Sequence, residues 1–187
     1  MYKKSRFSTL SILSLILVVV FIPQCTEPPE NTRLILENDL GTLSTRVTYS
    51  ATPIVIDTTL QESGLRKAMI DPVQLILIAE VDPPEIDGQP LQATDVYVKD
   101  NKAYVAYNMI GEPYQGAVDI FDVKDEDDPE LISSVILTDS DVNGLALNGN
   151  DLYLALATDR EDFDSPAVVE KIRLNKDQLT DESETFD

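Results

Sequence analysis

The amino-acid sequence predicts an all-β fold made of antiparallel four-stranded units that follow an N-terminal signal segment. Short β-rich runs separated by turn residues recur between residues 72 and 175, and this spacing is typical of all-β folds. One stretch of this pattern is repeated further along the chain. The first 24 residues have a basic start and an apolar run, which indicates an export signal rather than part of the folded domain.

The composition excludes several kinds of chemistry. The 187 residues include no His and a single Cys, so neither a Ser-His-Asp triad nor a cysteine-rich zinc site can be assembled within the chain. The formal net charge is −20, and loss of Lys3, Lys4 and Arg6 with a cleaved signal would make it −20 − 3 = −23. Such a surface repels phosphate groups, so we expect no nucleic-acid partner, and no residue pattern suggests a cofactor.

Residues 1–24 are predicted to be a signal peptide. Lys3, Lys4 and Arg6 form the basic region, and the apolar run from Leu10 to Ile22 is shorter than the roughly 20 residues that a membrane span needs. The usual small-residue cleavage site is missing. The boundary reads "FIPQCTEPPE" instead and contains the only cysteine of the chain, Cys25.

This boundary resembles that of bacterial lipoprotein precursors, in which a lipobox ends in a cysteine that is diacylated and becomes the mature N-terminus. Ile22 fits the pattern, whereas Pro23 and Gln24 depart from the family's small residues. The resemblance implies Cys25 as the lipidation site and an exported protein held on the outer membrane or cell surface of a Gram-negative bacterium. Each buried acyl methylene contributes about 0.8 kcal/mol to such an anchor. An uncleaved anchor and an unmodified linker cysteine are the alternatives.

Two segments precede the repeats. Residues 25–33 are predicted to be a stiff polar tether, since they contain "TEPPEN". Residues 34–71 are predicted to be an irregular N-terminal segment with short strands at "TRVTYS" and "PIVID" and one possible short helix over Leu60–Met69. Asp71 and Pro72 would end that helix.

Residues 72–187 are predicted to form the repeat region. The expected strands are "PVQLILIAEVD", "ATDVYVKDN", "KAYVAYNM", "GAVDIFDVK", "LISSVILT", "NGLALNGN", "DLYLALAT" and "AVVEKIRLNK". The residues Ala93–Tyr107 align with Val142–Leu156 at an offset of 142 − 93 = 49, which brings Tyr104 onto Tyr153. Further on, "VDIFDV" aligns with "VEKIRL" after a loop two residues longer.

A period of this length with four strands indicates blades of a β-propeller. The strands are apolar on both faces, as expected where each blade lies between two neighbours. The alignment predicts that seven apolar side chains are mostly buried: Val96, Val98, Tyr104, Ile120, Leu145, Leu147 and Tyr153. Only two to three blades fit, whereas propellers usually have 4–8. The region is therefore predicted to be a partial propeller, truncated from a longer protein, with assembly between copies or a smaller β-sandwich as alternatives.

The repeats resemble bacterial β-propeller repeats of the LVIVD kind. The matching stretches are "VYVKDNKAYVAY", "VDIFDVKDEDDPELISSV" and "LALNGNDLYLALA", and the turn Asp125–Pro129 is among the most specific parts. The second copy lacks that turn in "EKIRLNKDQL". The resemblance covers about Pro72 to Asn175 and implies a propeller fold and an envelope location, but no catalytic residues.

A stretch beginning at Asp139, "DSDVNGLALNGN", opens like an EF-hand calcium loop. The twelfth residue of such a loop is a bidentate Glu, but here it is Asn150. The sequence is better explained as a strand and a two-residue turn. A calcium site at Asp139, Asp141 and Asn143, or one at Asp159, Glu161, Asp162 and Asp164, is a weak alternative, and no metal site is expected.

These observations predict a lipid-anchored envelope protein whose propeller domain binds or scaffolds a protein or carbohydrate ligand, without catalysis. One alternative is a carboxylate-based hydrolase, because "DEDDPE" and "DREDFD" contain paired acids. Another is a surface protein that binds divalent cations.

Overall fold

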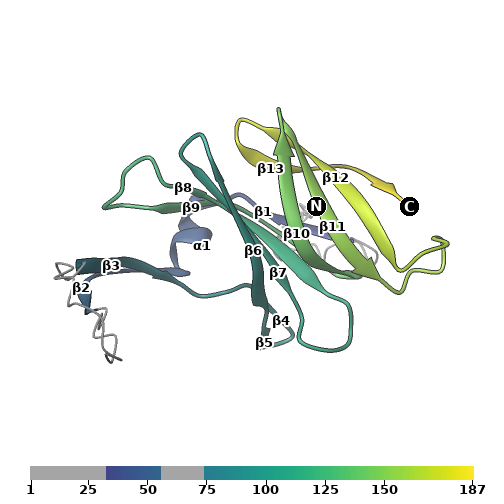
Figure 1. Ribbon diagram of the computed structural model, residues 1–187, viewed down its shortest axis with the longest axis horizontal. Helices are drawn as coiled ribbons and strands as arrows, with labels where there is room; N and C mark the ends of the chain where they lie inside the picture. The colour runs from purple at the N-terminus through teal and green to yellow at the C-terminus, as the bar shows by residue number, and fades with distance from the viewer. Residues whose placement is uncertain (1–32, 56–73) are drawn as a thin grey trace, which may run out of the picture. The chain divides into compact units, whose positions relative to one another are not determined.

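The computed structural model of the chain describes residues 33–55 and 74–187. The described residues form one short helix and thirteen strands (Figure 1). They are β1 (Leu34–Glu37), α1 (Leu40–Ser44), β2 (Val47–Val55), β3 (Gln74–Val81), β4 (Glu85–Ile86), β5 (Gln89–Pro90), β6 (Gln92–Lys99), β7 (Lys102–Asn108), β8 (Gly116–Asp122), β9 (Glu130–Leu137), β10 (Ser140–Asn148), β11 (Asp151–Thr158), β12 (Ala167–Asn175) and β13 (Gln178–Phe186). In these two ranges, no helix is long and apolar enough to cross a membrane. The predicted helix over Leu60–Met69 lies outside them.

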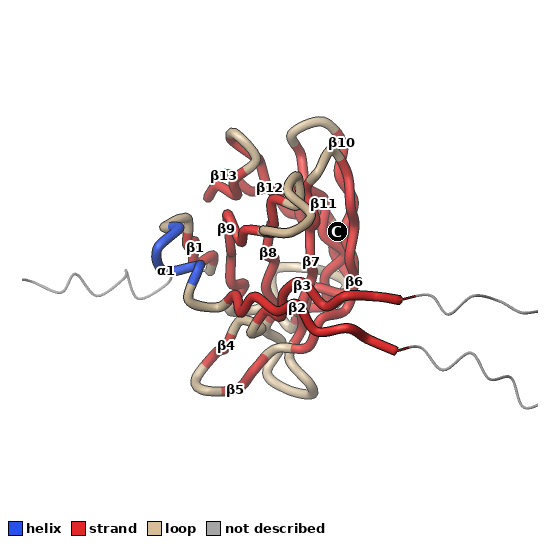
Figure 2. Tube along the Cα trace, turned by 90° about the vertical axis from the view of Figure 1, so that its left-hand side faces the viewer, coloured by secondary structure: helices blue, strands red, loops and turns tan. Residues whose placement is uncertain are grey.

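Two antiparallel sheets dominate the fold. One has five strands in the order β1-β9-β8-β7-β6, and the other has four in the order β10-β11-β12-β13. Two smaller antiparallel pairs, β2-β3 and β4-β5, complete the described structure (Figure 2). The predicted antiparallel four-stranded sheet is confirmed, but residues 33–55 and 74–187 contain no closed propeller.

The strand β1 belongs to the five-stranded sheet, although it lies far from the other strands of that sheet in the sequence. It pairs with β9, so that Leu34 lies opposite Leu137 and Glu37 opposite Ser134. Leu34 and Leu36 thereby pack against the main core. Part of the N-terminal segment thus belongs to the same sheet as the first repeat.

The two sheets are equivalent in local geometry as well as in sequence. The register between β6 and β7 shifts between Ala93 and Asp95, and the register between β10 and β11 shifts between Val142 and Gly144. The extra residues, Thr94 and Asn143, are separated by 143 − 94 = 49 positions, the offset of the repeat. A β-bulge at the same position in both sheets indicates two copies of one design, because bulges are specific features of a strand pair.

The bulges also join the two sheets to each other. The Thr94 hydroxyl donates a hydrogen bond to the carbonyl of Val142 at 2.7 Å. The Asp95 carboxylate accepts one from the N–H of Leu145 at 3.1 Å. Side chains at the first bulge therefore bond to backbone groups at and beside the second.

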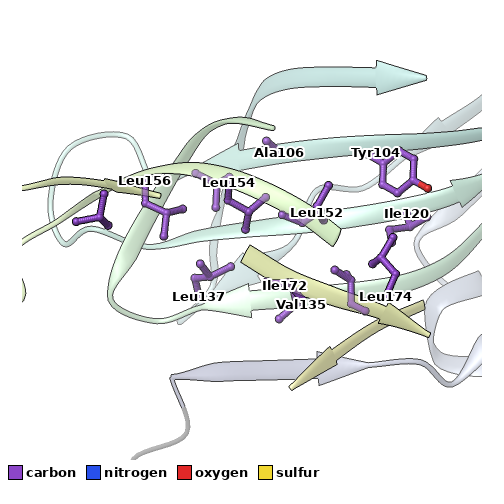
Figure 3. Packing of buried hydrophobic residues seen from close by; sticks show 14 residues of the cluster. Tyr104, Ala106, Ile120, Val135, Leu137, Leu152, Leu154, Leu156, Ile172 and Leu174 are labelled. Atoms are coloured by element: carbon purple, nitrogen blue, oxygen red, sulfur yellow. The ribbon is translucent and has the colours of Figure 1, made fainter. Parts of the chain in front are cut away.

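The main hydrophobic core lies between the two sheets. Figure 3 shows Leu152 and Leu154 of β11 in this core together with Val135 and Leu137 of β9. All four side chains are buried, with no more than traces of exposed surface. Alternation along each strand explains this core, because every second side chain of a strand points to the same face.

The seven predicted core residues divide into three groups. Tyr104 and Ile120 are buried as predicted, whereas Leu145, Leu147 and Tyr153 are only partly buried. The prediction is wrong for Val96 and Val98, which are each 62% exposed. These two valines lie on the face of β6 turned away from the four-stranded sheet, and no described element covers that part of the face.

The end of the chain also differs from the prediction. The last strand that the sequence predicts is "AVVEKIRLNK", but the structure has one more, β13, which pairs with β12 and completes the four-stranded sheet. Lys176 and Asp177 make the two-residue turn, with φ of 51° and 65°. Positive φ at both turn positions is the geometry that suits a tight hairpin. The missing Asp-to-Pro turn is therefore replaced by a shorter connection.

Candidate functional site

Two fully buried acids occupy equivalent positions in the two sheets. Asp119 lies in β8 and Glu170 in β12, and both side chains are inaccessible to solvent. Their separation, 170 − 119 = 51, equals the offset between "VDIFDV" and "VEKIRL". Burying an isolated carboxylate is strongly unfavourable, so each acid needs a cationic partner.

Arginines from the N-terminal segment provide both partners. Arg33, which precedes β1, donates to both carboxylate oxygens of Glu170, with Nη1 at 2.9 and 2.8 Å from them. Its Nε also lies 3.5 Å from the carboxylate of Asp139. This forked contact is the geometry that a guanidinium group offers to a carboxylate.

Arg46 holds the other acid in the same way. Its Nη1 and Nη2 lie 3.1 and 2.5 Å from the two carboxylate oxygens of Asp119. Ser134 accepts a longer bond from the same guanidinium group at 3.4 Å. Burial raises the pKa of Tyr107 far above its ordinary value, and the neighbouring charge of Asp119 and a hydrogen bond with it act in the same direction.

The backbone around each arginine is repeated too. The N–H of Thr138, just after β9, donates to the carbonyl of Arg33 at 3.0 Å, and the N–H of Asp82, just after β3, donates to that of Arg46 at 2.9 Å. Each arginine thus extends an antiparallel strand pair, β1-β9 or β2-β3, by one residue. From there its side chain reaches the buried acid of a sheet.

These arginine–acid pairs are suited to holding elements together rather than to reacting with a ligand. Both carboxylates are covered by protein and occupied by guanidinium groups, so neither can take a proton from a bound molecule in this arrangement. Sequence reasoning missed both pairs. A signal was present for the acids, because Asp119 and Glu170 align within apolar strands, but nothing in the sequence connects them with Arg33 or Arg46.

A surface groove lies at the turn between β8 and β9. It is an open groove of about 670 Å³ lined by Asp122, Lys124, Asp125, Glu126, Asp128 and Glu130. The predicted Asp125–Pro129 turn is confirmed here, since the N–H of Asp127 donates to the Asp125 carboxylate at 3.1 Å. The N–H of Lys124, with help from Lys102, lowers the pKa of Asp122. The groove is open and strongly acidic, and it suits a cationic partner surface.

The three residues of the EF-hand-like opening point to different partners. Asp139 lies near Arg33 and Arg160, and Asp141 accepts the N–H of Gln115 at 3.1 Å. Asn143 accepts the side-chain amide of Asn108 at 3.2 Å. The segment is the strand β10 followed by the two-residue turn at Gly149 and Asn150, which confirms the strand interpretation.

The second candidate cluster lies in the loop between β11 and β12. Asp162 pairs with Arg160 through two of the guanidinium nitrogens, at 3.0 and 2.5 Å, and this bond lowers its pKa. Arg160 also stacks on the ring of Phe163 at 4.6 Å. Asp159, Glu161 and Asp164 are exposed. Among the residues in the described ranges, no group of three or more acidic or Cys side chains is arranged to hold a metal ion.

Cys25, the predicted lipidation site, lies outside the described residues, as does the whole predicted signal peptide. Comparison with known proteins provides no further guide. No protein family, no curated protein and no solved structure matches the chain.

Proposed function

We propose that the chain is a lipid-anchored cell-envelope protein whose sheets are blade-like units of a propeller-type domain that binds or scaffolds a protein or carbohydrate partner. The observation that carries the proposal is the pair of equivalent sheets with the same bulge, packed face to face. Stacked repeats of this kind create extended surfaces suited to binding. The buried acids are engaged by arginines and the other acids lie mostly at exposed turns, which favours binding over catalysis.

The anchor rests on the sequence around Cys25 and is tested directly by mass. The native protein is extracted from membranes of the producing cell and its intact mass is measured. We expect the mass of Cys25–Asp187 plus a diacylglyceryl group, and a Cys25→Ala variant should lose both the added mass and the cleavage. An unmodified Cys25 on an uncleaved chain would refute the lipoprotein proposal.

The binding role is tested separately from the anchor. The membrane-extracted protein is screened against immobilised envelope polysaccharides and envelope proteins, and in parallel for hydrolysis of the same polysaccharides. We expect reversible binding that weakens with salt, since the open groove is acidic and charged contacts are screened, and no hydrolysis. Release of sugar products would instead favour the carboxylate hydrolase alternative.

A further inference from the structure

The strand β3 has one free edge among the strands that the structure describes. It pairs only with β2. The equivalent strand of the five-stranded sheet is β9, because β1-β9 and β2-β3 both end in an arginine whose carbonyl accepts the next N–H. The second edge of β9 is filled by the antiparallel strand β8. The corresponding edge of β3 is therefore where an antiparallel strand is missing.

The two strands of the pair differ in how they protect their edges. The strand β2 carries Pro53, which has no N–H to donate, and a register irregularity between Tyr49 and Thr52. Proline and bulges are typical of a strand that ends a sheet. The strand β3, "QLILIAEV", has neither proline nor a glycine, and its only charged residue is Glu80. It has the composition of a strand with neighbours on both sides.

The charge of the chain restricts what can approach this edge. The formal net charge is −20, so two copies repel each other over most surfaces. The pair β2-β3 is an exception, since β2 has no charged residue. Leu75 and Ile76 of β3 are nevertheless 45% and 57% exposed. An apolar, almost uncharged edge on a strongly acidic chain is suited to an identical edge.

We propose that β3 pairs antiparallel with β3 of a second copy of the chain, so that two β2-β3 pairs form one four-stranded sheet about a twofold axis. A twofold axis makes the same patch serve both partners, and it gives the antiparallel direction that β8 uses on β9. A register centred on Leu77, as a twofold axis normal to the sheet requires, places Glu80 opposite Gln74 of the partner subunit. Two opposed acids would destabilise the pairing, and in this register no two acids face each other. The inference does not depend on the lipid anchor or on the ligand.

The test is the mass of the full-length protein extracted in detergent, measured by sedimentation over a range of concentrations. Wild-type protein should form particles with two chains. Ile76→Lys and Leu75→Lys each place two lysines in the shared sheet, one from each copy, and should weaken the dimer about tenfold. Ile110→Lys is the matched control, because Ile110 is 76% exposed but lies in the loop between β7 and β8, and it should leave the dimer intact.

The two test variants separate edge pairing from other contacts. Neighbouring side chains of a strand point to opposite faces, so contact through one face of β2-β3 would respond to only one of them. Weakening by both supports edge pairing. A wild-type protein with one chain per particle, a dimer insensitive to both variants, or a dimer sensitive to one variant only would overturn the proposal. Both substituted side chains are exposed, and a β-sheet circular dichroism spectrum verifies that each variant folds.

Discussion

At the scale of single residues, the buried pairs give the clearest prediction. Replacement of Arg46 by Met leaves Asp119 buried without a cation, and we expect a loss of about 3–5 kcal/mol in the free energy of unfolding. Urea denaturation measures this loss. Arg173→Met is the matched control. Arg173 pairs with Asp151 at 2.7 Å, but their side chains are 53% and 25% exposed, so this change should cost less than about 1 kcal/mol.

A second substitution shows whether the unpaired charge of Asp119 causes this loss of stability. A buried ion pair can often be replaced by apolar residues at little cost. We therefore expect the double variant Arg46→Met with Asp119→Leu to recover most of the stability lost in Arg46→Met, again by urea denaturation. No recovery would mean that the packing of the arginine, including its bond to the carbonyl of Asp82, matters more than the charge of Asp119.

Asp141 provides a prediction about pH. Burial raises its pKa above the ordinary value of 3.8, although bonds from the N–H groups of Gln115 and Met109 oppose the shift. Between the pKa of Asp141 in the unfolded chain and its higher pKa in the folded protein, the folded protein binds more protons than the unfolded chain. Ionisation of Asp141 therefore lowers the free energy of unfolding as pH rises through this range. Asp141→Asn removes this penalty. The variant should gain stability relative to wild type between about pH 3 and pH 7, as measured by denaturation at each pH, and an unchanged difference would contradict the assignment.

The sequence predicted the types of several of these residues but not their contacts. The acids in β8 and β12 align in the repeat, and the turn acids of Asp125–Pro129 lie where expected. The calcium candidates Asp139, Asp141 and Asn143 are close in sequence, but Asp139 precedes β10 and Asn143 is its bulge residue, and each side chain turns to a different partner. Pairing Arg33 with Glu170 requires the tertiary structure, because 137 residues separate them.

At the scale of strands, close approach between the sheets makes one glycine necessary. A Cβ at Gly116 would lie 2.7 Å from the N of Val142 and 2.8 Å from the carbonyl oxygens of Ser140 and Tyr107. All three are backbone atoms that cannot move aside. Gly116→Ala should destabilise the protein by about 1–3 kcal/mol. Thermal or urea denaturation tests this, with Gly144→Ala as control, because its Cβ would meet only the Asp95 side chain at 3.5 Å.

In the turn between β12 and β13, we expect a substitution that stabilises the protein. Lys176 has a φ of 51°, a conformation that Asn adopts more readily than Lys. We expect Lys176→Asn to raise the free energy of unfolding by about 0.5–1 kcal/mol. Lys124→Asn removes the same charge at a position without positive φ and serves as the control. Equal effects of the two substitutions in urea denaturation would show that charge, not backbone conformation, is responsible.

Strands were largely predictable because alternation and turn residues are local signals. The hairpins at Asp100-Asn101 and Gly149-Asn150 have the two-residue connections that their turn residues favour. The strand β13 was missed because "QLTDESETF" carries few apolar residues. Its inward-facing Leu179 is buried, whereas most of its other side chains are exposed.

At the scale of the whole molecule, net charge opposes the compact state. A chain with a formal net charge of −20 repels itself when folded. Salt screens exposed charges, and the screening length falls from about 10 Å at 0.1 M to about 3 Å at 1 M. We expect the free energy of unfolding in urea to rise as sodium chloride is raised from low to high concentration. The buried arginine–acid pairs should be little affected. A fall in stability would show that exposed pairs such as Lys171 with Glu184 outweigh the general repulsion.

The arrangement of the sheets was only partly predictable, because contacts between distant segments leave no local pattern in the sequence. The repeat predicted two equivalent units, and the structure contains two sheets with matching bulges. The repeat did not predict β1 at the edge of the first sheet, since Leu34 and Leu137 share no local pattern. The repeat also predicted Val96 and Val98 as buried, because the inner strands of stacked blades lie between neighbours. Their counterparts Leu145 and Leu147 pack against the main core, whereas no neighbouring sheet covers Val96 and Val98 among the described residues.

The long reach of the two arginines sets an order on folding during synthesis. Arg46 and Arg33 are made early, and their acids follow 73 and 137 residues later. At about 5–20 residues per second, a growing chain spends several seconds with both guanidinium groups and β1 unpaired. The five-stranded sheet gains its outer strand β1 only after β9 has been made, and Glu170 of β12 is made later still. A chain that has not yet reached β12 therefore lacks the partner of Arg33, and this buried pair can form only after both sheets have been made.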